Sequence, residues 1–372
     1  MKHLGINLPL SRLIASLAIL TILLQISSSA QTNAQKKDET QDQDVIKLEA
    51  SLVTFNVSVV DSAGRPVFNL KETDFTVAED GVEQKIAFFS TVEEPFSLVL
   101  LIDISGSTAD QIDLMRTAAR NFISQMRPGD RIALIAFGRE AELIEDFTSD
   151  RKKLDEAISR IEPAPRSQAS TAFYDALQLM TEELLNKIKG RKAFIALTDG
   201  VDSSSHYSYE TVGPTIEKSG AVAYFIEVDT EDFSLAGVIK PRADPSRIEF
   251  SPQQLKKYAD VYIGGEEAAR YRDHFNLSPL ERREVNKGIY QLAREELREM
   301  AERTGGRVYP VKQLQQIGGA YKEIADELRM QYSIGYYPSN TARDGKWREI
   351  KIDVKRSGAT AHTRPGYYAP KD

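Results

Sequence analysis

Asp103, Ser105 and Ser107 place one carboxylate and two hydroxyls at every second position, directly after an apolar run over residues 96–102. Side-chain oxygens suit a hard cation such as Mg²⁺, and no histidine or cysteine that would favour zinc or copper stands nearby. The apolar run predicts a strand buried on both faces of a sheet. Because ligands of open α/β sheets bind beyond the carboxyl ends of the strands, the motif lies where such a fold places a binding site.

Two further positions carry suitable oxygens. Thr171 stands at the start of a helix predicted over residues 172–188, and Asp199 follows an apolar strand predicted over residues 193–197. Three loops at one edge of a parallel sheet can converge on one ion, and Mg²⁺ accepts hydroxyls, carboxylates and waters in octahedral geometry. The alternative is that Ser107 caps the helix that follows it. Capping explains one hydroxyl but not Asp103, Thr171 and Asp199 together.

This set of residues resembles the metal-ion-dependent adhesion site of the von Willebrand factor A domain. Asp103, Ser105 and Ser107 match its D-x-S-x-S motif, while Thr171 and Asp199 match its second and third loops. The resemblance covers roughly residues 96–335. It implies that the serines and the threonine contact the metal and that the aspartates often act through water. It further implies that a carboxylate of a protein partner completes the coordination, with Mn²⁺ or Ca²⁺ as alternatives to Mg²⁺.

The flanking segments resemble a subgroup of these domain proteins found in Acidobacteria. An inserted segment, residues 231–286, departs from the family pattern, and we expect its scattered aromatic residues to pack a small core of their own rather than to face a partner. The matching segments are Gly64-Arg65-Pro66-Val67, Phe75-Thr76-Val77, Glu79-Asp80-Gly81, Gly335-Tyr336-Tyr337-Pro338 and Arg364-Pro365-Gly366-Tyr367-Tyr368.

The order of apolar segments predicts an α/β fold: a doubly wound, mostly parallel sheet flanked by helices, plus a small all-β, sandwich-like module built from both chain ends. Alternating apolar and polar residues over 48–92 and again near the carboxyl terminus predict the strands of that module. The predicted parts are a signal peptide (1–30), a disordered linker (31–47), the first part of the β module (48–95), the A-type domain with its insertion (96–338) and the strands that complete the module (339–372).

Composition and the amino terminus restrict the function. Lysine and arginine number 48 against 55 acidic residues, a net charge of −7 without a basic cluster, so nucleic acid is not an expected partner. The chain has no cysteine, which excludes disulfides and thiol chemistry.

The first thirty residues are typical of a secretory signal, with a retained anchor as the alternative. They contain Lys2 and Arg12, an apolar stretch over residues 13–26, and Ser28-Ser29-Ala30. We expect a periplasmic, secreted or cell-surface protein with no other membrane span.

Enzymatic hypotheses agree less well with the residues of the candidate site. A phosphotransferase that uses Asp103 as its nucleophile needs a second aspartate two positions on, where the chain has Ser105. A serine hydrolase needs a base, and His206 lies in a polar stretch typical of a solvated loop. Asp202 and His206 are instead candidate partner contacts, and we otherwise expect Asp202 to face solvent. The sequence therefore predicts a non-enzymatic protein that captures an acidic side chain of a protein partner. A structural or envelope-assembly protein, in which the metal only stabilises the loops, is the alternative, and a metal-dependent hydrolase is a third reading.

Overall fold

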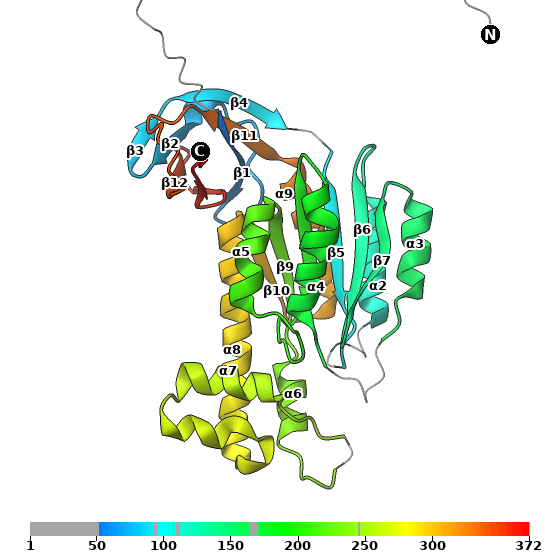
Figure 1. Cartoon of the computed structure of the whole chain (residues 1–372). Coiled ribbons are helices and arrows are strands. Elements are labelled where there is room, and N and C mark those ends of the chain that lie inside the picture. The colour runs from blue at the N-terminus through cyan, green and yellow to red at the C-terminus, as the bar shows by residue number, and fades with distance from the viewer. Residues whose placement is uncertain are drawn as a thin grey trace, which may run out of the picture. The chain divides into compact units, whose positions relative to one another are not determined.

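The apolar run predicted as a buried strand forms β5 (Ser97–Asp103), and all of its residues are buried. It lies in a six-stranded sheet of order β10-β9-β8-β5-β6-β7. The strands from β10 to β6 run parallel, and β7 pairs antiparallel with β6 at the edge (Figure 1). The other strands of this sheet are β6 (Arg131–Phe137), β7 (Ala141–Thr148), β8 (Lys192–Thr198), β9 (Val222–Val228) and β10 (Arg307–Val311).

The computed structural model describes residues 52–92, 95–106, 108, 112–163, 170–244 and 246–371. The predicted signal peptide and linker lie outside these residues, as does Ser107 of the candidate site. No helix in the described ranges has the length and apolar character needed to cross a bilayer.

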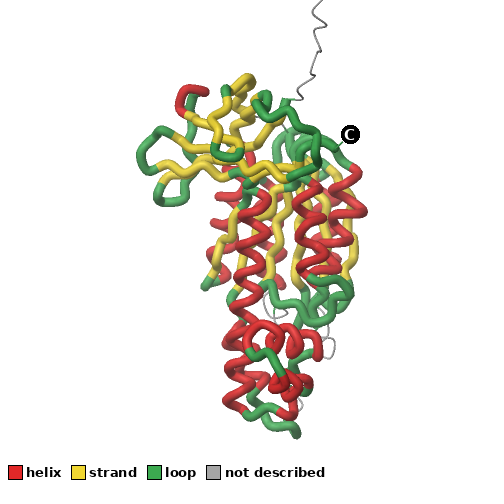
Figure 2. The backbone as a smooth tube through the Cα atoms, turned by 60° about the vertical axis from the view of Figure 1, so that its left-hand side comes forward, coloured by secondary structure: helices red, strands yellow, loops and turns green. Residues whose placement is uncertain are grey.

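Each face of the central sheet is covered by helices, as the parallel strands require. Leu98, Leu100 and Ile102 of β5 pack with α2, α3 and α9, whereas Val99 and Leu101 pack with α4, α5 and the carboxyl half of α8. Figure 2 shows helices on both sides of the strands. The helices are α2 (Ile112–Ser124), α3 (Arg151–Arg160), α4 (Phe173–Leu179, continued by a π-turn over Met180–Leu184 and a 3₁₀ turn over Leu185–Lys187), α5 (Tyr209–Ser219), α8 (Pro279–Thr304) and α9 (Ile317–Arg329, preceded by a 3₁₀ turn over Leu314–Gln316).

Strands from residues 53–92 and from residues 331–368 form a β-sandwich, as predicted. One antiparallel sheet has the order β13-β1-β11-β4 and the other β14-β12-β2-β3, and their inner faces share one apolar core. The predicted fold class is thereby confirmed. The strands are β1 (Val53–Asp61), β2 (Phe75–Glu79), β3 (Val82–Gln84), β4 (Ile86–Val92), β11 (Gln331–Tyr336), β12 (Trp347–Val354), β13 (Ala359–His362) and β14 (Gly366–Tyr368), with a 3₁₀ turn over Glu72–Asp74.

One boundary differs from the sequence analysis. Strand β11, which we assigned to the A-type domain, pairs on both sides with strands of the sandwich: Phe55 of β1 stands opposite Ile334, and Ile334 stands opposite Phe89 of β4. Its alternate residues Tyr332, Ile334 and Tyr336 are buried in the sandwich core. The pattern of the strand predicts a half-buried face correctly, but it contains no information on which sheet supplies the partner strands.

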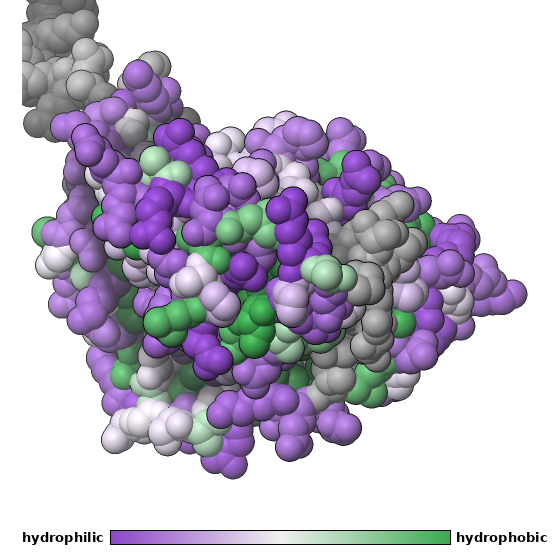
Figure 3. Space-filling model, turned by 90° about the horizontal axis from the view of Figure 1, so that it is seen from below, coloured by the Kyte–Doolittle hydropathy of each residue, from purple (hydrophilic) through white to green (hydrophobic). Residues whose placement is uncertain are grey.

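The inserted segment forms α6 (Glu231–Val238), α7 (Pro252–Tyr262), 3₁₀ turns over Glu266–Arg272 and His274–Asn276, and the first two turns of α8, residues 279–286. Helix α8 begins at Pro279, where Ser278 and Glu281 form a capping box. As expected, the segment has a core of its own, which includes Phe250, Tyr258 and Tyr271. Phe233 and Tyr262 are exposed, and Figure 3 shows apolar side chains in several places on the mostly hydrophilic lower face.

Candidate functional site

The first loop of the candidate site follows β5. Asp103 and Ser105 are fully buried. The Ser105 amide donates a hydrogen bond to Asp103 Oδ1 (2.9 Å), and the Thr108 hydroxyl donates to the carbonyls of Asp103 (2.8 Å) and Ser105 (3.1 Å). These bonds form a tight turn that directs the motif away from the strand end. Ser107 belongs to this loop, but it lies outside the described residues.

The third loop follows β8, the parallel neighbour of β5. Thr198 at the end of β8 donates a hydrogen bond to Asp103 Oδ2 (2.8 Å) and accepts one from the Gly200 amide (3.0 Å). Asp199 is 4% exposed, and its Oδ1 accepts a hydrogen bond from the Val201 amide (2.9 Å). The first and third loops are therefore linked directly at the carboxyl edge of the sheet.

The second loop carries Thr171, which is 6% exposed. The Thr171 amide donates to Ser203 Oγ (2.8 Å), and the Thr171 carbonyl accepts from the amides of Ser203 (2.9 Å) and Ser204 (3.1 Å). The next residue, Ala172, donates its amide to the Gly138 carbonyl just after β6 (2.6 Å). Thr171 is thus bound to the loop that Asp199 begins.

Asp202 does not face solvent but connects these loops through hydrogen bonds. Its Oδ1 accepts hydrogen bonds from the Phe173 amide (2.9 Å) and the Ser205 hydroxyl (2.5 Å). Burial raises the pKa of Asp202 to about 6. The carboxylate is therefore occupied by groups of the chain at the start of α4, and a role in contacting a partner stays an untested prediction.

His206, the other candidate partner contact, has a side chain that is 90% exposed. Its Nδ1 lies 2.8 Å from Asp175 Oδ2, and the other oxygen of Asp175 accepts from the amides of His206 (2.8 Å) and Tyr207 (3.1 Å). The hydrogen bond with Asp175, followed by the negative charge of that residue, raises the pKa of His206. The imidazole is accessible to a partner, and its orientation is set by α4.

The electrostatics of the edge favour a cation. Burial, followed by the negative charge of Asp199, raises the pKa of Asp103 to about 7. No lysine or arginine in the described part of the chain forms an ion pair with Asp103. A divalent ion between the two acids would offset both their desolvation and their repulsion. The residues therefore fit an ion that prefers oxygen ligands.

The donor set is mixed. Among the described residues, no group of three or more His, Cys, Asp or Glu side chains is placed to hold a metal. Two carboxylates and the hydroxyls of Ser105 and Thr171 remain as the described candidates. Carboxylate and hydroxyl oxygens are ligands for divalent ions that accept oxygen donors.

Sequence reasoning missed the residues that hold these side chains. Thr108 and Thr198 bond to Asp103, and Thr230 donates its hydroxyl to Asp199 Oδ2 (2.5 Å). Tyr290 in turn contacts the Thr230 hydroxyl (2.8 Å). Thr198 directly precedes Asp199 in the sequence, so the register of the two neighbouring strands could have predicted that Thr198 lies near Asp103. Nothing in the sequence pairs Thr230 with Tyr290.

Comparison with known proteins agrees with this architecture. Residues 98–201 match the family model of the von Willebrand factor type A domain. Together with the fold, the match indicates a domain of this type within the chain, and such domains typically mediate protein interaction or adhesion rather than catalysis. An uncharacterized protein of Borreliella burgdorferi is 25% identical over 146 residues, which cover 37% of this chain and 42% of that protein.

Several solved structures are similar at low sequence identity. An aerotolerance-related membrane protein from Bacteroides fragilis is 18% identical and covers 63% of this chain and 98% of its own, with a TM-score of 0.38. A von Willebrand factor type A structure from Catenulispora acidiphila is 12% identical, covering 86% and 74%, with a TM-score of 0.40. Proximal thread matrix protein 1 from the mussel byssus, with zinc in its MIDAS motif, is 14% identical, covering 67% and 50%, also with a TM-score of 0.40. At TM-scores below 0.5 these likenesses carry no weight for function.

Proposed function

We propose that this chain is an exported, non-enzymatic binding protein that captures an acidic side chain of a protein partner through a divalent cation. Asp103, Ser105, Ser107, Thr171 and Asp199 would hold the ion, which we take to be Mg²⁺, with Mn²⁺ or Ca²⁺ as alternatives. The observation that carries the proposal is the pair of buried carboxylates, Asp103 and Asp199, at the carboxyl ends of the neighbouring strands β5 and β8, where Thr198 donates to Asp103.

The chemistry of the donor set explains why such an ion would bind a partner. Hydroxyls are neutral ligands, so an ion held largely by hydroxyls and water keeps most of its positive charge. It then attracts an external carboxylate, which replaces a water. The exposed His206, beside this edge on a loop bonded to α4, is a candidate contact for the rest of the partner.

Metal binding is the first test. Isothermal titration of the chain with MgCl₂ should show one site, and Asp103→Asn should weaken binding by about tenfold or more, ~1.4 kcal/mol. Asp130→Asn is the matched control. Asp130 is another buried aspartate, which accepts hydrogen bonds from the Phe96 and Arg127 amides near the start of β6, at the opposite edge of the sheet. This control should lose stability but keep the affinity for Mg²⁺.

Capture of a carboxylate is the second test. Acetate serves as a bare carboxylate and acetamide as its neutral counterpart, and binding is followed by NMR shifts of the amides of Ser105 and Gly200. Acetate should shift these amides only when Mg²⁺ is present, and acetamide should not. Shifts that are equal with and without EDTA, or equal for both probes, contradict the adhesive mechanism.

The alternative, a metal that only stabilises the loops of an envelope protein, predicts a different result. A structural ion raises the melting temperature in the absence of any partner, by mass action on the folded state. The hydrogen bonds from Thr108, Thr198 and Thr230 already connect these loops, which favours the adhesive role. A large rise in melting temperature together with no response to acetate would support the structural role instead.

Export is proposed from the segment over residues 1–30, which lies outside the described residues. The mass of the mature protein, purified from its native envelope, distinguishes a cleaved signal from a retained anchor. A full-length mass in the cytosolic fraction would contradict export.

A further inference from the structure

Two residues that flank the inserted segment, Thr230 and Tyr290, contact each other beside the Asp199 carboxylate. Thr230 stands just before α6, and Tyr290 lies on α8 shortly after the segment ends; both side chains are buried. The Thr230 hydroxyl donates to Asp199 Oδ2 (2.5 Å) and lies 2.8 Å from the Tyr290 hydroxyl. A threonine hydroxyl has a single proton, and the carboxylate takes it. Tyr290 must therefore donate to Thr230, which gives a relay of donors that ends on Asp199.

This relay controls the orientation of the carboxylate. Oδ1 of Asp199 accepts a hydrogen bond from the amide of its own loop at Val201 (2.9 Å), whereas Oδ2 is held by Thr230. Rotation of the carboxylate about its own axis is thus restrained on both sides. The hydrogen bond on the second side comes from Thr230, which flanks the inserted segment.

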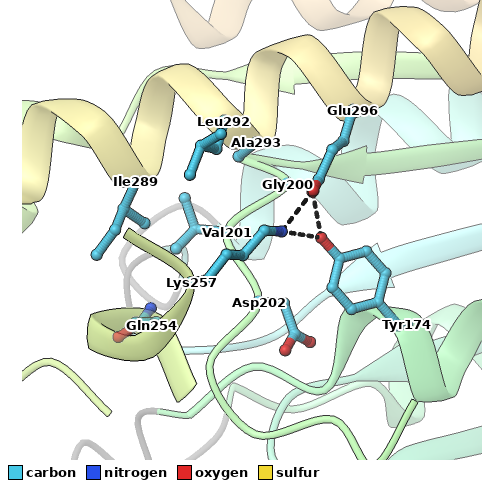
Figure 4. A pocket seen from close by; sticks show the side chains of 10 residues that line it. All are labelled: Tyr174, Gly200, Val201, Asp202, Gln254, Lys257, Ile289, Leu292, Ala293 and Glu296. Carbon is cyan, nitrogen blue, oxygen red and sulfur yellow. Dashed lines mark hydrogen bonds and ion pairs between the residues drawn. The ribbon is translucent and has the colours of Figure 1, made fainter. Parts of the chain in front are cut away.

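A second set of contacts holds the segment beside the same loops (Figure 4). Lys257 of α7 lies 2.5 Å from Glu296 Oε1 and donates to the Tyr174 hydroxyl (3.1 Å), and Tyr174 donates to the other oxygen of Glu296. Gln253 of α7 donates to the Ser205 carbonyl (3.0 Å). The pocket lined by Tyr174, Lys257 and Glu296, among others, has a volume of about 20 Å³, enough for one water. It is therefore a packing contact between helices rather than a ligand site.

We propose that Thr230 and Tyr290, which flank the inserted segment, set the metal affinity of the site as positioning residues for Asp199. The inference rests on the proposed function of that site. Residues that orient a metal ligand through hydrogen bonds commonly change metal affinity by about 10- to 100-fold when they are removed. Thr230 and Tyr290 would therefore act on the ion through Asp199, without contacting it.

The test compares Thr230→Val, Thr230→Ser and Tyr290→Phe in the full chain, with Mn²⁺ and Mg²⁺ affinities measured by titration. Thr230→Val keeps the shape and removes the donor, and should weaken binding by about tenfold or more. Thr230→Ser restores the donor and should bind within about twofold of the wild type, and Tyr290→Phe should fall between them. Hydrogen exchange of the metal-free protein gives a second readout, since Thr230→Val should speed exchange at the Val201 amide.

Thr181→Val is the matched control. Thr181 is also buried, and its hydroxyl donates to the Leu177 carbonyl (2.7 Å), away from the site. It should lower stability and leave metal affinity and Val201 exchange unchanged. If Thr230→Val behaves like this control, Thr230 is only structural and the inference is overturned, while the proposed function stands. A wild-type chain that binds neither metal overturns the proposed function itself, and the inference with it.

Discussion

His274 shows at the scale of one residue how the fold changes the chemistry of a side chain. It is 3% exposed and packs against the Phe250 ring, with 5.3 Å between ring centroids, and its Nδ1 accepts a long hydrogen bond from the Phe250 amide (3.4 Å). Burial, followed by the positive charge of Arg282, lowers the pKa of His274. The remaining charged groups that act on it are Glu249, Arg247 and Asp273.

The lowered pKa predicts a loss of stability in acid. Between the folded pKa and the unfolded value of about 6.5, the unfolded chain binds a proton that the folded chain does not. The free energy of unfolding therefore keeps its full value above pH 6.5 and decreases as the pH falls below it. His274→Asn keeps an acceptor and cannot titrate. Urea denaturation at pH 7.5 and 5.5 should show a smaller acid-induced loss in this variant than in the wild type.

NMR titration of the histidine rings supplies the control within the same molecule. The pKa of His206 is raised by Asp175, so this ring should titrate above pH 6.5 while His274 titrates below it. A midpoint for His274 at or above 6.5 would contradict the interpretation of its environment.

Helix α8 is the element that links the inserted segment to the A-type domain. Val285 and Ile289 belong to the core of the segment, whereas Leu297 and Met300 belong to the core beneath the central sheet. The helix thus contributes to two cores from different positions along its length. Its sequence therefore lacks one continuous apolar stripe.

Gly288 allows α7 to approach α8 closely. A Cβ at this position would lie 2.4 Å from the Tyr258 ring, so Gly288→Ala should destabilise the packing by about 1–3 kcal/mol. Gly319→Ala in α9 is the matched control, because a Cβ there meets nothing within 4 Å and alanine gains up to about 1 kcal/mol of helix propensity. Denaturant unfolding with hydrogen exchange of α7 measures both. Equal effects of the two substitutions would argue against the close packing of α7 on α8.

At the scale of the whole molecule, Glu327 of α9 joins the A-type domain to the β-sandwich. The carboxylate is 1% exposed and accepts hydrogen bonds from Ser58 of β1 (2.8 Å), Tyr224 of β9 (3.1 Å) and Tyr309 of β10 (3.0 Å), with Arg307 at 3.4 Å. One buried acid therefore satisfies hydroxyls from both parts of the fold. A buried carboxylate is stable only when its oxygens are hydrogen-bonded in this way.

Glu327→Gln should weaken this junction, since an amide has one acceptor oxygen and its NH₂ group cannot accept from a hydroxyl that now lacks a partner. We expect a cost of about 1–3 kcal/mol. Glu323→Gln, at an exposed position one turn earlier on α9, should change stability by less than about 0.5 kcal/mol. Guanidinium denaturation compares the two variants. A cost at Glu327 no larger than that at Glu323 would contradict the role of the junction.

The sequence by itself determined those features that depend on local pattern. The apolar run before Asp103 identifies a central strand because both of its faces are buried, and the position of Asp199 after another such run places both acids at the same edge. The alternation of apolar and polar residues over 48–92 and near the carboxyl terminus predicts the β-sandwich, because side-chain direction in a strand has a period of two.

Only the tertiary structure decided which distant groups meet. Thr230 bonds to Asp199 and contacts Tyr290, Glu327 bonds to Ser58, and β11 joins the sandwich. The packing of helices on the sheet and the pairing of strands bring together these residues, which are far apart in the chain. A hydrogen bond between two such side chains leaves no periodic signal in the sequence, since it depends on the position of each backbone and not on spacing along one element. The inserted segment acquires its relation to the site in this way.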